Sequence, residues 1–471
     1  MVGPSSFPGP RSLTSRSSRP RPAPLAHNGL SRTRRVPLDG PLPDVTGSFS
    51  DTVGPFPPDL AAVTLIAPPS GEIFVAEPIA TIPFESGPGH TLPRELARRL
   101  AEEPLGPVRL PTGDVVTLAV RHADIVAVLT DPRFSRDLRY PGAPRIQPGL
   151  DISDNPDLLV NMDGAEHARL RRLLSGTFTP RQIEKWRPRV REIAGRLLDG
   201  LGPPGTVTDL IEAYTFPIPI TVICEIFGVE GLDHERVRAW SETILTVHVD
   251  NVEEQVTSTL RFMEYVRKLV AEHRGDPGDG LLRLLLDARD EDDRLTEDEL
   301  VNTVMGLIAA GHDTTANVLA RGLLRLLSEG EYAGLVRDPS RIPAAVEEML
   351  RWDPPGDSTL LRVATEDVDL PSGRIAAGEV VLPMVRAANF DPGVLRDPGD
   401  FRPARGECPH LSFGRGAHYC LGANLARMEL QEALRVLVDR VPTLRLAVPA
   451  EEIPWQESAL TSRLKRLPTT H

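Results

Sequence analysis

FGRGAHYCLGA, the stretch from Phe413 to Ala423, places Cys420 directly before a helical pattern. A thiolate is a strong metal ligand, and it is favoured at a helix N-terminus because unpaired backbone N–H groups point toward it. Gly414, Gly416 and Gly422 permit the backbone to approach a flat, bulky group. The stretch therefore predicts a metal-bound thiolate.

Two other interpretations of this cysteine remain open from the residues alone. Free cysteine is most often a small buried side chain without a ligand, so Cys420 also suits a turn in the core. Four zinc ligands are also at hand in Cys408, His410, His418 and Cys420, although their C-x-H and H-x-C spacings are shorter than those of most structural zinc sites.

The composition excludes several classes of protein. The chain has 471 residues and a net charge of -13, which argues against nucleic acid as a partner. It has no run of about 18 apolar residues, so no membrane-spanning helix is predicted. Three cysteines in so long a chain do not make a disulfide framework, and they favour a reducing, cytoplasmic location.

The N-terminal region differs from the rest of the chain. Residues 1–35 contain seven arginines, many serines and prolines and no acidic residue, and prolines continue densely to about Pro69. Such a segment buries too little apolar surface to offset its ordering entropy, so residues 1–70 are predicted to be a disordered extension. Its prolines would break the amphipathic helix of a transit peptide. A non-functional extension, or a start codon assigned too early, is therefore favoured.

From about residue 90 the pattern predicts a mainly helical body with a minority of sheet. A hairpin is indicated within residues 108–120, and a second β-rich zone lies between 360 and 412. No linker divides this body, so residues 71–471 are predicted to be one domain. Apolar periodicity predicts helices at 121–131, 163–200, 208–228, 233–247, 252–274, 279–289, 296–328, 341–352 and 421–441.

The best-defined helix extends from Leu295 to Leu327, with Thr296 and Glu299 as a capping box at its start. Its middle holds the polar stretch AAGHDTTA, Ala309 to Ala316, in which Gly, Asp and Thr are poor helix formers. Such a local conflict is typical of a functional site. It is equally typical of a glycine packing contact beside hydroxyls that bond back to the preceding turn.

Two shorter patterns place charged groups one helical turn apart. His167 and Arg171 are four residues apart, and two such donors can bind a pair of carboxylates. Glu348 and Arg351 are three residues apart and can form an ion pair. Taken alone, each pattern is more often a solvated helix face.

Together these stretches resemble the cytochrome P450 family, the haem-thiolate monooxygenases, in the family's own order over roughly residues 90–469. FGRGAHYCLG resembles its haem-binding loop, and AGHDTT (310–315) resembles its oxygen-activating turn. The resemblance implies a single-domain, mainly α fold with a smaller β-rich region. The remaining matches are EHARLRR (166–172) with the helix that binds the haem propionates, Glu348 and Arg351 with the Glu-x-x-Arg pair, and residues 389–405 with the segment before the haem loop.

The resemblance also assigns roles at the haem. It implies haem b as the cofactor, with the sulfur of Cys420 as axial ligand of the iron, a ligand that favours O–O cleavage. Phe413 is expected to pack near that thiolate and to tune the iron. The residues expected to hold the haem propionates are His167, Arg171, Arg362 and His418.

The polar turn of the long helix is expected to deliver protons. By the resemblance, Thr314 hydrogen-bonds to bound dioxygen or water, and Asp313 relays protons to it. Gly311 is expected to let the helix open beside them, and Glu348 with Arg351 becomes a buried structural pair. The residues expected to line the substrate pocket are Met305, Ile308, Ala309, Thr359 and Leu460.

The activity that the resemblance implies is that of an oxidoreductase acting on paired donors with incorporation of molecular oxygen. We expect hydroxylation or epoxidation of a small-to-medium organic molecule in secondary metabolism, such as antibiotic biosynthesis. Two alternatives remain open: oxidative coupling or desaturation without oxygen insertion, and a non-catalytic haem-binding protein. The expected electron donors are a ferredoxin and its reductase, acting on a monomer, with Arg169, Arg172, Arg415 and Arg427 as docking candidates.

Overall fold

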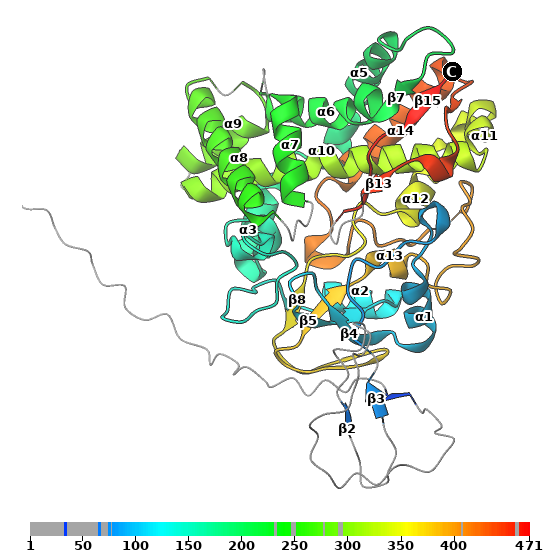
Figure 1. Cartoon of the computed structure of the whole chain (residues 1–471). Helices are drawn as coiled ribbons and strands as arrows, with labels where there is room; N and C mark the ends of the chain where they lie inside the picture. The colour runs from blue at the N-terminus through cyan, green and yellow to red at the C-terminus, as the bar shows by residue number, and fades with distance from the viewer. Residues whose placement is uncertain are drawn as a thin grey trace, which may run out of the picture.

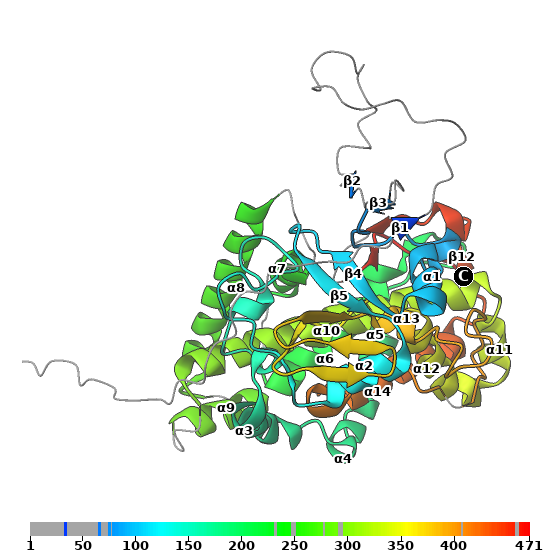
Figure 2. The same ribbon diagram turned by 90° about the horizontal axis from the view of Figure 1, so that it is seen from below.

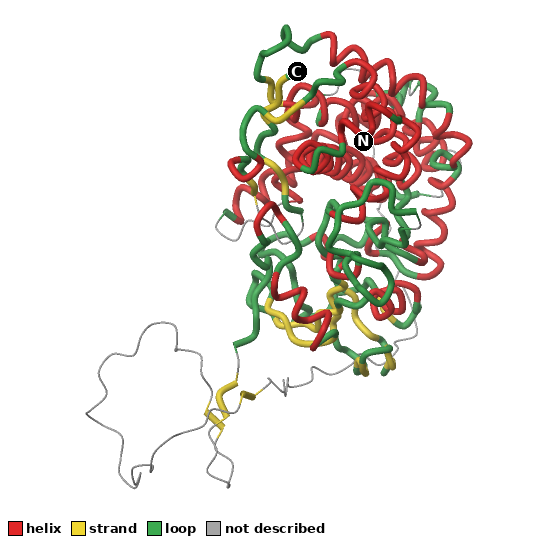
Figure 3. Tube along the Cα trace, turned by 90° about the vertical axis from the view of Figure 1, so that its right-hand side faces the viewer, coloured by secondary structure: helices red, strands yellow, loops and turns green. Residues whose placement is uncertain are grey.

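Long helices occupy one side of the molecule and short strands the other (Figure 1). The view turned about the vertical axis shows the same division, with the main strands at the end away from most helices (Figure 3). The computed structural model describes residues 33–34, 65–66, 74–76, 78–229, 233–245, 251–276, 278–290, 295–406, 408–456 and 461–471.

The helical side is arranged around α10 (Glu297–Ser328), which packs against α6, α8, α12 and α14. The predicted capping box starts α10, because the Glu299 N–H donates to Thr296 Oγ1 at 3.0 Å and the Thr296 N–H donates to Glu299 Oε2 at 2.9 Å. The other α-helices are α1 (Arg94–Glu102), α2 (His122–Thr130), α3 (Gly164–Ser175), α4 (Pro180–Glu184), α5 (Arg187–Asp199), α6 (Pro217–Phe227), α7 (His234–Leu245), α8 (Val252–His273), α9 (Leu281–Asp290), α11 (Tyr332–Arg337), α12 (Ile342–Trp352), α13 (Val385–Ala388) and α14 (Ala423–Arg440).

The strands form one main sheet and several small ones. The main sheet has the order β4-β5-β11-β8-β6, in which only the β5–β11 pair is parallel. Seen from below, β4 and β5 lie in front of α10, so sheet and helices form two layers (Figure 2). The strands are β1 (Thr33–Arg34), β2 (Leu65–Ile66), β3 (Phe74–Ala76), β4 (Leu105–Arg109), β5 (Val115–Ala119), β6 (Phe134–Ser135), β7 (Thr208–Asp209), β8 (Arg362–Ala364), β9 (Val368–Leu370), β10 (Gly373–Ile375), β11 (Val380–Pro383), β12 (Arg445–Leu446), β13 (Trp455–Gln456), β14 (Arg463–Leu464) and β15 (Pro468–Thr470).

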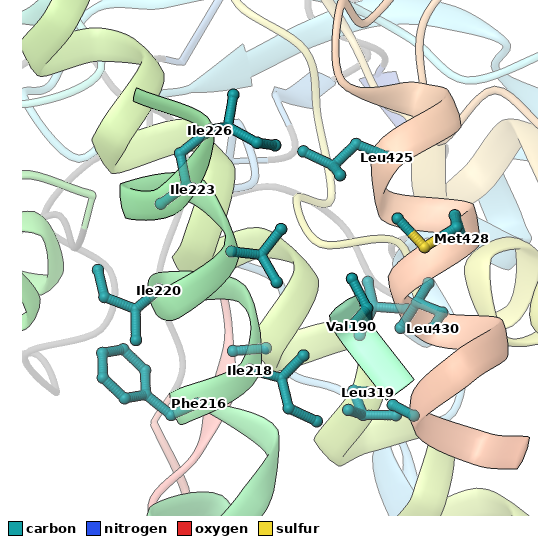
Figure 4. Close-up of a cluster of buried hydrophobic side chains, with 14 of the residues drawn as sticks. Val190, Phe216, Ile218, Ile220, Ile223, Ile226, Leu319, Leu425, Met428 and Leu430 are labelled. Atoms are coloured by element: carbon teal, nitrogen blue, oxygen red, sulfur yellow. The ribbon is translucent and has the colours of Figure 1, made fainter. Parts of the chain in front are cut away.

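The largest core lies between the helices and supports the helix that follows the cysteine. Ile218 and Ile226 of α6 lie on the side that faces Leu425 and Met428 of α14, with Leu319 of α10 nearby (Figure 4). Each fully buried aliphatic side chain contributes about 1.5–3 kcal/mol relative to exposure. Because of this packing, α14 is a fixed base on which the preceding loop is held.

Most predicted helices and strands are confirmed, but a long apolar pattern that was predicted to be one helix is divided in the structure. The predicted helix at 163–200 is three helices, α3 to α5, and α1 and α11 were not predicted. The hairpin within 108–120 is β4–β5, whose turn uses Gly113 at φ 94°. The β-rich zone predicted at 360–412 contains β8 to β11 and ends at Pro383, earlier than predicted. A mainly α fold with a smaller β-rich region is therefore confirmed.

The predicted extension at residues 1–70 lies mostly outside the described residues, which include only β1 and β2 of that range; both strands pair with β3. Of the described helices, none has the length and hydropathy needed to cross a membrane. All three cysteines are free.

Candidate functional site

The cysteine loop is a tight turn closed by backbone hydrogen bonds. The Cys420 N–H donates to the Phe413 carbonyl at 2.8 Å, and α14 starts at Ala423 rather than at the predicted Leu421. Gly414 and Gly416 have φ of 68° and 69°, a region that disfavours side chains. At Gly416 an added Cβ would lie 2.5 Å from the Leu129 carbonyl oxygen of α2, so this glycine serves the docking of the loop on α2.

The sulfur of Cys420 lies in an environment with opposing effects on its charge. Burial is the larger effect and raises the pKa of the thiol above its usual value, whereas the Gly422 N–H and the guanidinium groups of Arg171 and Arg427 act in the opposite direction. These groups favour the thiolate, which is the form that binds a metal. The position of Cys420 just before α14 agrees with the predicted role.

Four cationic or donating side chains gather beside this loop, as predicted. The rings of His167 in α3 and His418 in the loop lie with centroids 4.3 Å apart. Arg171 donates to the Tyr419 carbonyl at 2.5 Å, and Arg362 lies in β8. Burial and the nearby His418 and Arg171 lower the pKa of His167 to about 4, and burial lowers the pKa of Arg362 to about 10.

Two of these groups have polar atoms that fit an anion. His167 Nε2 and Arg362 Nε are buried and have no hydrogen-bond partner among the described residues. Orphaned donors beside other cations favour binding of carboxylates. The donor set therefore fits the two propionates of a haem, with Cys420 on the same loop as His418.

Two residues around these cations were not predicted. Asp163 directly precedes α3, lies 3.8 Å from His418 Nε2, and accepts hydrogen bonds from Ser135 Oγ at 2.6 Å and from the Arg136 N–H at 2.9 Å. Burial raises the pKa of Asp163, but hydrogen bonds from His418 and Ser135 hold it at about 2. Arg136 is buried, and Asn161 Oδ1 accepts from its Nη2 at 2.8 Å. Sequence spacing gave no signal for either residue, because their partners are distant in the chain.

The polar turn of α10 lies on an exposed strip of an otherwise packed helix. The strip contains Gly306, Leu307, Ala310, Gly311 and Thr314, of which Ala310 is exposed and the others are half-buried. The helix is unbroken here, so the predicted opening at Gly311 is absent from the described α10. An added Cβ at Gly311 would lie 3.0 Å from Ile223 Cγ1 of α6, which agrees with the alternative of a packing contact.

Residues 146–161 lie over this strip and are attached to two helices. Leu158 Cδ2 would lie 3.3 Å from a Cβ at Gly306, and Asn155 Nδ2 donates to Asn302 Oδ1 of α10 at 2.8 Å. Gln255 Nε2 of α8 donates to the Leu150 carbonyl at 2.8 Å. This segment therefore lies over the start of the strip at Gly306, whereas Ala310 further along the strip is exposed.

The two predicted proton-delivery residues point to different surroundings. Thr314 Oγ1 donates back to the Ala310 carbonyl at 2.8 Å on the exposed strip. Asp313 is buried, with Oδ2 accepting from Asn317 Nδ2 at 3.1 Å and Oδ1 lying 3.5 Å from Arg463 Nη1. Arg463 also lies 3.1 Å from Glu242 of α7, so the acid is joined to a charged group from a strand 150 residues later.

The Glu348–Arg351 pair is buried, as the family resemblance implied, and the solvated-face interpretation is wrong. Arg351 Nε and Nη2 donate to the two carboxylate oxygens of Glu348 at 2.8 and 2.9 Å. Arg351 also donates to the Asn389 and Pro398 carbonyls at 3.0 Å. The pair fixes the segment that leads to the cysteine loop.

Other expectations need correction. Met305 and Ile308, which the resemblance placed at the substrate pocket, are buried in the helical core and do not lie on the exposed strip. Leu460 lies outside the described residues. Within the described chain no group of three or more His, Cys, Asp or Glu side chains is placed to hold a metal ion, so the four-ligand zinc hypothesis is not supported.

Comparisons with known proteins identify the relatives of this chain. The family model of cytochrome P450 matches residues 229–337 and 342–443. The nocardicin C N-oxygenase of Nocardia uniformis subsp. tsuyamanensis is 42% identical over 375 residues, covering 79% of this chain and 93% of that protein. The mycinamicin IV hydroxylase/epoxidase of Micromonospora griseorubida is 39% identical over 395 residues, covering 83% of this chain and 98% of that protein. The crystal structure of a cytochrome P450mel with biaryl coupling reactivity has a TM-score of 0.78 and 33% identity, covering 84% of this chain and 100% of that one.

Proposed function

Because the chain belongs to the cytochrome P450 family of haem-thiolate monooxygenases, we propose that the sulfur of Cys420 would bind its haem iron. The observation that supports this assignment is the position of Cys420 directly before α14, on the same loop as His418, whose ring centroid lies 4.3 Å from that of His167. When bound, the haem would supply the iron centre at which dioxygen is activated, and thiolate ligation favours cleavage of the O–O bond.

The propionates are held by the cations beside the loop. His167 and Arg362 present buried nitrogen atoms that lack partners among the described side chains, and His418 and Arg171 complete the set. Asp163 orients His418 from the side of α3, because its carboxylate is itself fixed by Ser135. Outer-shell contacts of this kind set the orientation of the groups that meet a cofactor.

The exposed strip of α10 supplies protons and an apolar surface for substrate. The Thr314 hydroxyl lies on the strip, and the buried carboxylate of Asp313, the preceding residue, is the proposed source of its protons. Water enters such a site only in a controlled way, because most of α10 is packed. Proton transfer by positioned side chains typically accelerates a reaction by about 10²–10⁴-fold.

The substrate is an organic molecule of secondary metabolism, which undergoes hydroxylation or epoxidation with one oxygen atom from dioxygen. The two relatives named above act on nocardicin C and mycinamicin IV, as their names state. A second candidate reaction is oxidative coupling, because a structure of the same fold with 33% identity belongs to a protein with biaryl coupling reactivity. A haem carrier without activity is disfavoured by the presence of both Asp313 and Thr314.

The electron donors are a ferredoxin and its reductase, and the enzyme works as a cytoplasmic monomer. Of the four docking candidates, Arg172 and Arg415 are exposed, whereas Arg169 is paired with Glu299 and Arg427 is held by Glu347. Exposed arginines on one face favour encounter with an acidic protein. The catalytic domain comprises residues 71–471, and residues 1–70 are not needed for catalysis.

The test of the ligand assignment is the spectrum of the reduced protein with carbon monoxide. Wild-type protein is expected to give the red-shifted Soret band of thiolate ligation, and Cys420→Ser is expected to lose it while retaining its helical content by circular dichroism. The matched control is Cys408→Ser, which removes a thiol twelve residues earlier and should keep the band. A band typical of histidine ligation in wild type would contradict the assignment.

A further inference from the structure

The ring of Phe413 lies beneath a cation that the family resemblance did not place there. The guanidinium carbon of Arg427 is 4.4 Å from the centroid of the Phe413 ring, within the range of a cation–π interaction. Phe413 is buried in the helical core cluster, and Arg427 lies on α14 one turn after the loop. The aromatic ring beside the cysteine is therefore fixed from one side by a charged group.

Arg427 is held in a single orientation by a bidentate ion pair. Its Nε donates to Glu347 Oε1 at 2.7 Å and its Nη2 donates to Glu347 Oε2 at 2.9 Å. Its remaining nitrogen, Nη1, donates to the Tyr419 hydroxyl at 3.1 Å. Such a fork geometry gives Arg a defined direction that Lys does not reproduce. One guanidinium thus joins α12, α14 and the residue before Cys420.

Glu347 has a second partner on the other side of the loop. His410 Nδ1 accepts from the Ser412 N–H at 3.3 Å, so His410 Nε2 carries the proton that is donated to Glu347 Oε2 at 3.1 Å. Burial raises the pKa of Glu347, but the hydrogen bonds from His410 and Arg427 hold it at about 2. The carboxylate is therefore a fixed negative charge at neutral pH.

Arg427 is attached to the residue next to the sulfur as well as to the ring. Arg171 binds the Tyr419 carbonyl and Arg427 the Tyr419 hydroxyl, so both are attached to the residue that precedes the cysteine. A cation at this place favours negative charge on the sulfur and on any metal bound to it.

We propose that Arg427, set in place by Glu347, is a positioning residue that fixes Phe413 and raises the reduction potential of the haem bound at Cys420. This inference rests on the proposed function, because it requires Cys420 to bind the iron. Reduction adds one electron to the iron site, so a nearby cation stabilises the reduced state and a nearby carboxylate opposes it. The two members of the ion pair therefore act on the potential in opposite directions.

The test is a dye-mediated redox titration of purified holoprotein without ferredoxin or substrate, so docking and turnover do not enter the result. Arg427→Gln removes the positive charge and is expected to shift the potential downward. Glu347→Gln leaves the charge of Arg427 uncompensated and is expected to shift the potential upward. A purely structural role would move both variants in the same direction, because both break the same pair.

Two further variants keep the test decisive if Arg427→Gln fails to retain haem. Arg427→Lys keeps the charge and loses the fork, so it should hold a potential near wild type but convert faster from the thiolate form of the carbon monoxide complex to the inactive form. Arg435→Gln removes one positive charge from the same helix two turns later, where it donates to the Pro339 carbonyl at 3.0 Å, and should leave the potential unchanged.

The outcomes separate this inference from the proposed function. Shifts of opposite sign in Arg427→Gln and Glu347→Gln, or an upward shift in Glu347→Gln with Arg427→Lys near wild type, support the role of the pair. Shifts of the same sign, or a shift in Arg435→Gln as large as in Arg427→Gln, overturn it. A wild-type spectrum without the thiolate band would instead overturn the assignment of Cys420, and this inference with it.

Discussion

The cysteine loop and the polar turn of α10 reach their functional geometry in different ways. The loop, residues 413–422, is held by local features that the chain carries within ten residues: two glycines at positive φ and a hydrogen bond from Cys420 to Phe413. The turn around Asp313 is an ordinary stretch of α-helix, and its buried carboxylate is paired with Arg463 from another element. A loop of this kind is defined by its own sequence, whereas the helix turn is defined by what packs around it.

The largest expected effect tests the turn. Asp313→Asn should lower oxygen consumption with a surrogate ferredoxin and reductase by about 100-fold, because an amide does not transfer protons. The carbon monoxide spectrum, which reports on the loop, should stay unchanged. Thr314→Ala is the companion variant, in which oxygen consumption should continue but yield hydrogen peroxide. Equal rates in Asp313→Asn and wild type would remove this residue from proton delivery.

The next effect tests the anchors beside the loop. Combining His167→Ala with Arg171→Ala should weaken haem retention by at least about tenfold, since charge-assisted hydrogen bonds contribute about 1.5–3 kcal/mol each. Transfer of haem to apomyoglobin measures the retention. Arg172→Ala, which removes an exposed arginine from the same helix, is the control and should retain haem as wild type does. Full retention in the double variant would contradict anchoring.

A smaller effect is expected from removing Arg463, the distant partner of Asp313. Arg463→Gln should lower oxygen consumption by roughly tenfold, which corresponds to about 1.4 kcal/mol in the barrier, because Asp313 loses the cation 3.5 Å from Oδ1. Arg463→Lys restores the charge and should recover part of the rate. If Arg463→Gln consumes oxygen at the wild-type rate while Asp313→Asn is slow, Asp313 acts without Arg463, and the turn depends on its own residues as the loop does.

The next prediction concerns the stability of α14, the helix that follows the cysteine loop, and its buried residue Glu429. Glu429 is buried with both oxygens unpartnered within the described part of the chain, and burial raises its pKa well above 4.5. The unfolded chain therefore loses this proton first as pH rises, so Glu429 costs up to about 1.4 kcal/mol of stability per pH unit above about 4.5 until its own pKa is reached.

Glu429→Gln should therefore raise the free energy of unfolding more at pH 8 than at pH 5, as measured by urea titration. Glu432→Gln is the matched change one turn later, where the carboxylate accepts from Arg187 and Arg191 at 2.7 and 2.8 Å. That variant should be destabilised. A gain for Glu429→Gln that is independent of pH would show that its carboxyl does not titrate as described.

Removal of the N-terminal region is expected to have no effect on either site. Deleting residues 1–69 should leave the carbon monoxide spectrum and the oxygen consumption unchanged, because every contact described for the loop and the turn involves residues after 78. A folded truncated protein without activity would show that the N-terminal region contributes to one of the two sites.

Sequence patterns predicted the loop, the capping box of α10 and the cations at His167 and Arg171, because each is encoded within a few residues. They did not predict Asp163, Arg136, Glu347 or Arg463, which matter through partners 27 to more than 200 residues away. The resemblance placed Met305 and Ile308 at the pocket, but both pack in the core, because the neighbours of a helix face depend on elements distant in the chain.

The contact between Leu150 and Gln255 has a kinetic consequence. Residues 146–161 lie over the start of the strip at Gly306, and the Gln255 amide holds them to α8. Displacing the segment breaks that hydrogen bond and the one between Asn155 and Asn302. A ligand that left the strip on this side would therefore leave only as fast as these bonds open, and openings of this kind limit turnover in many enzymes.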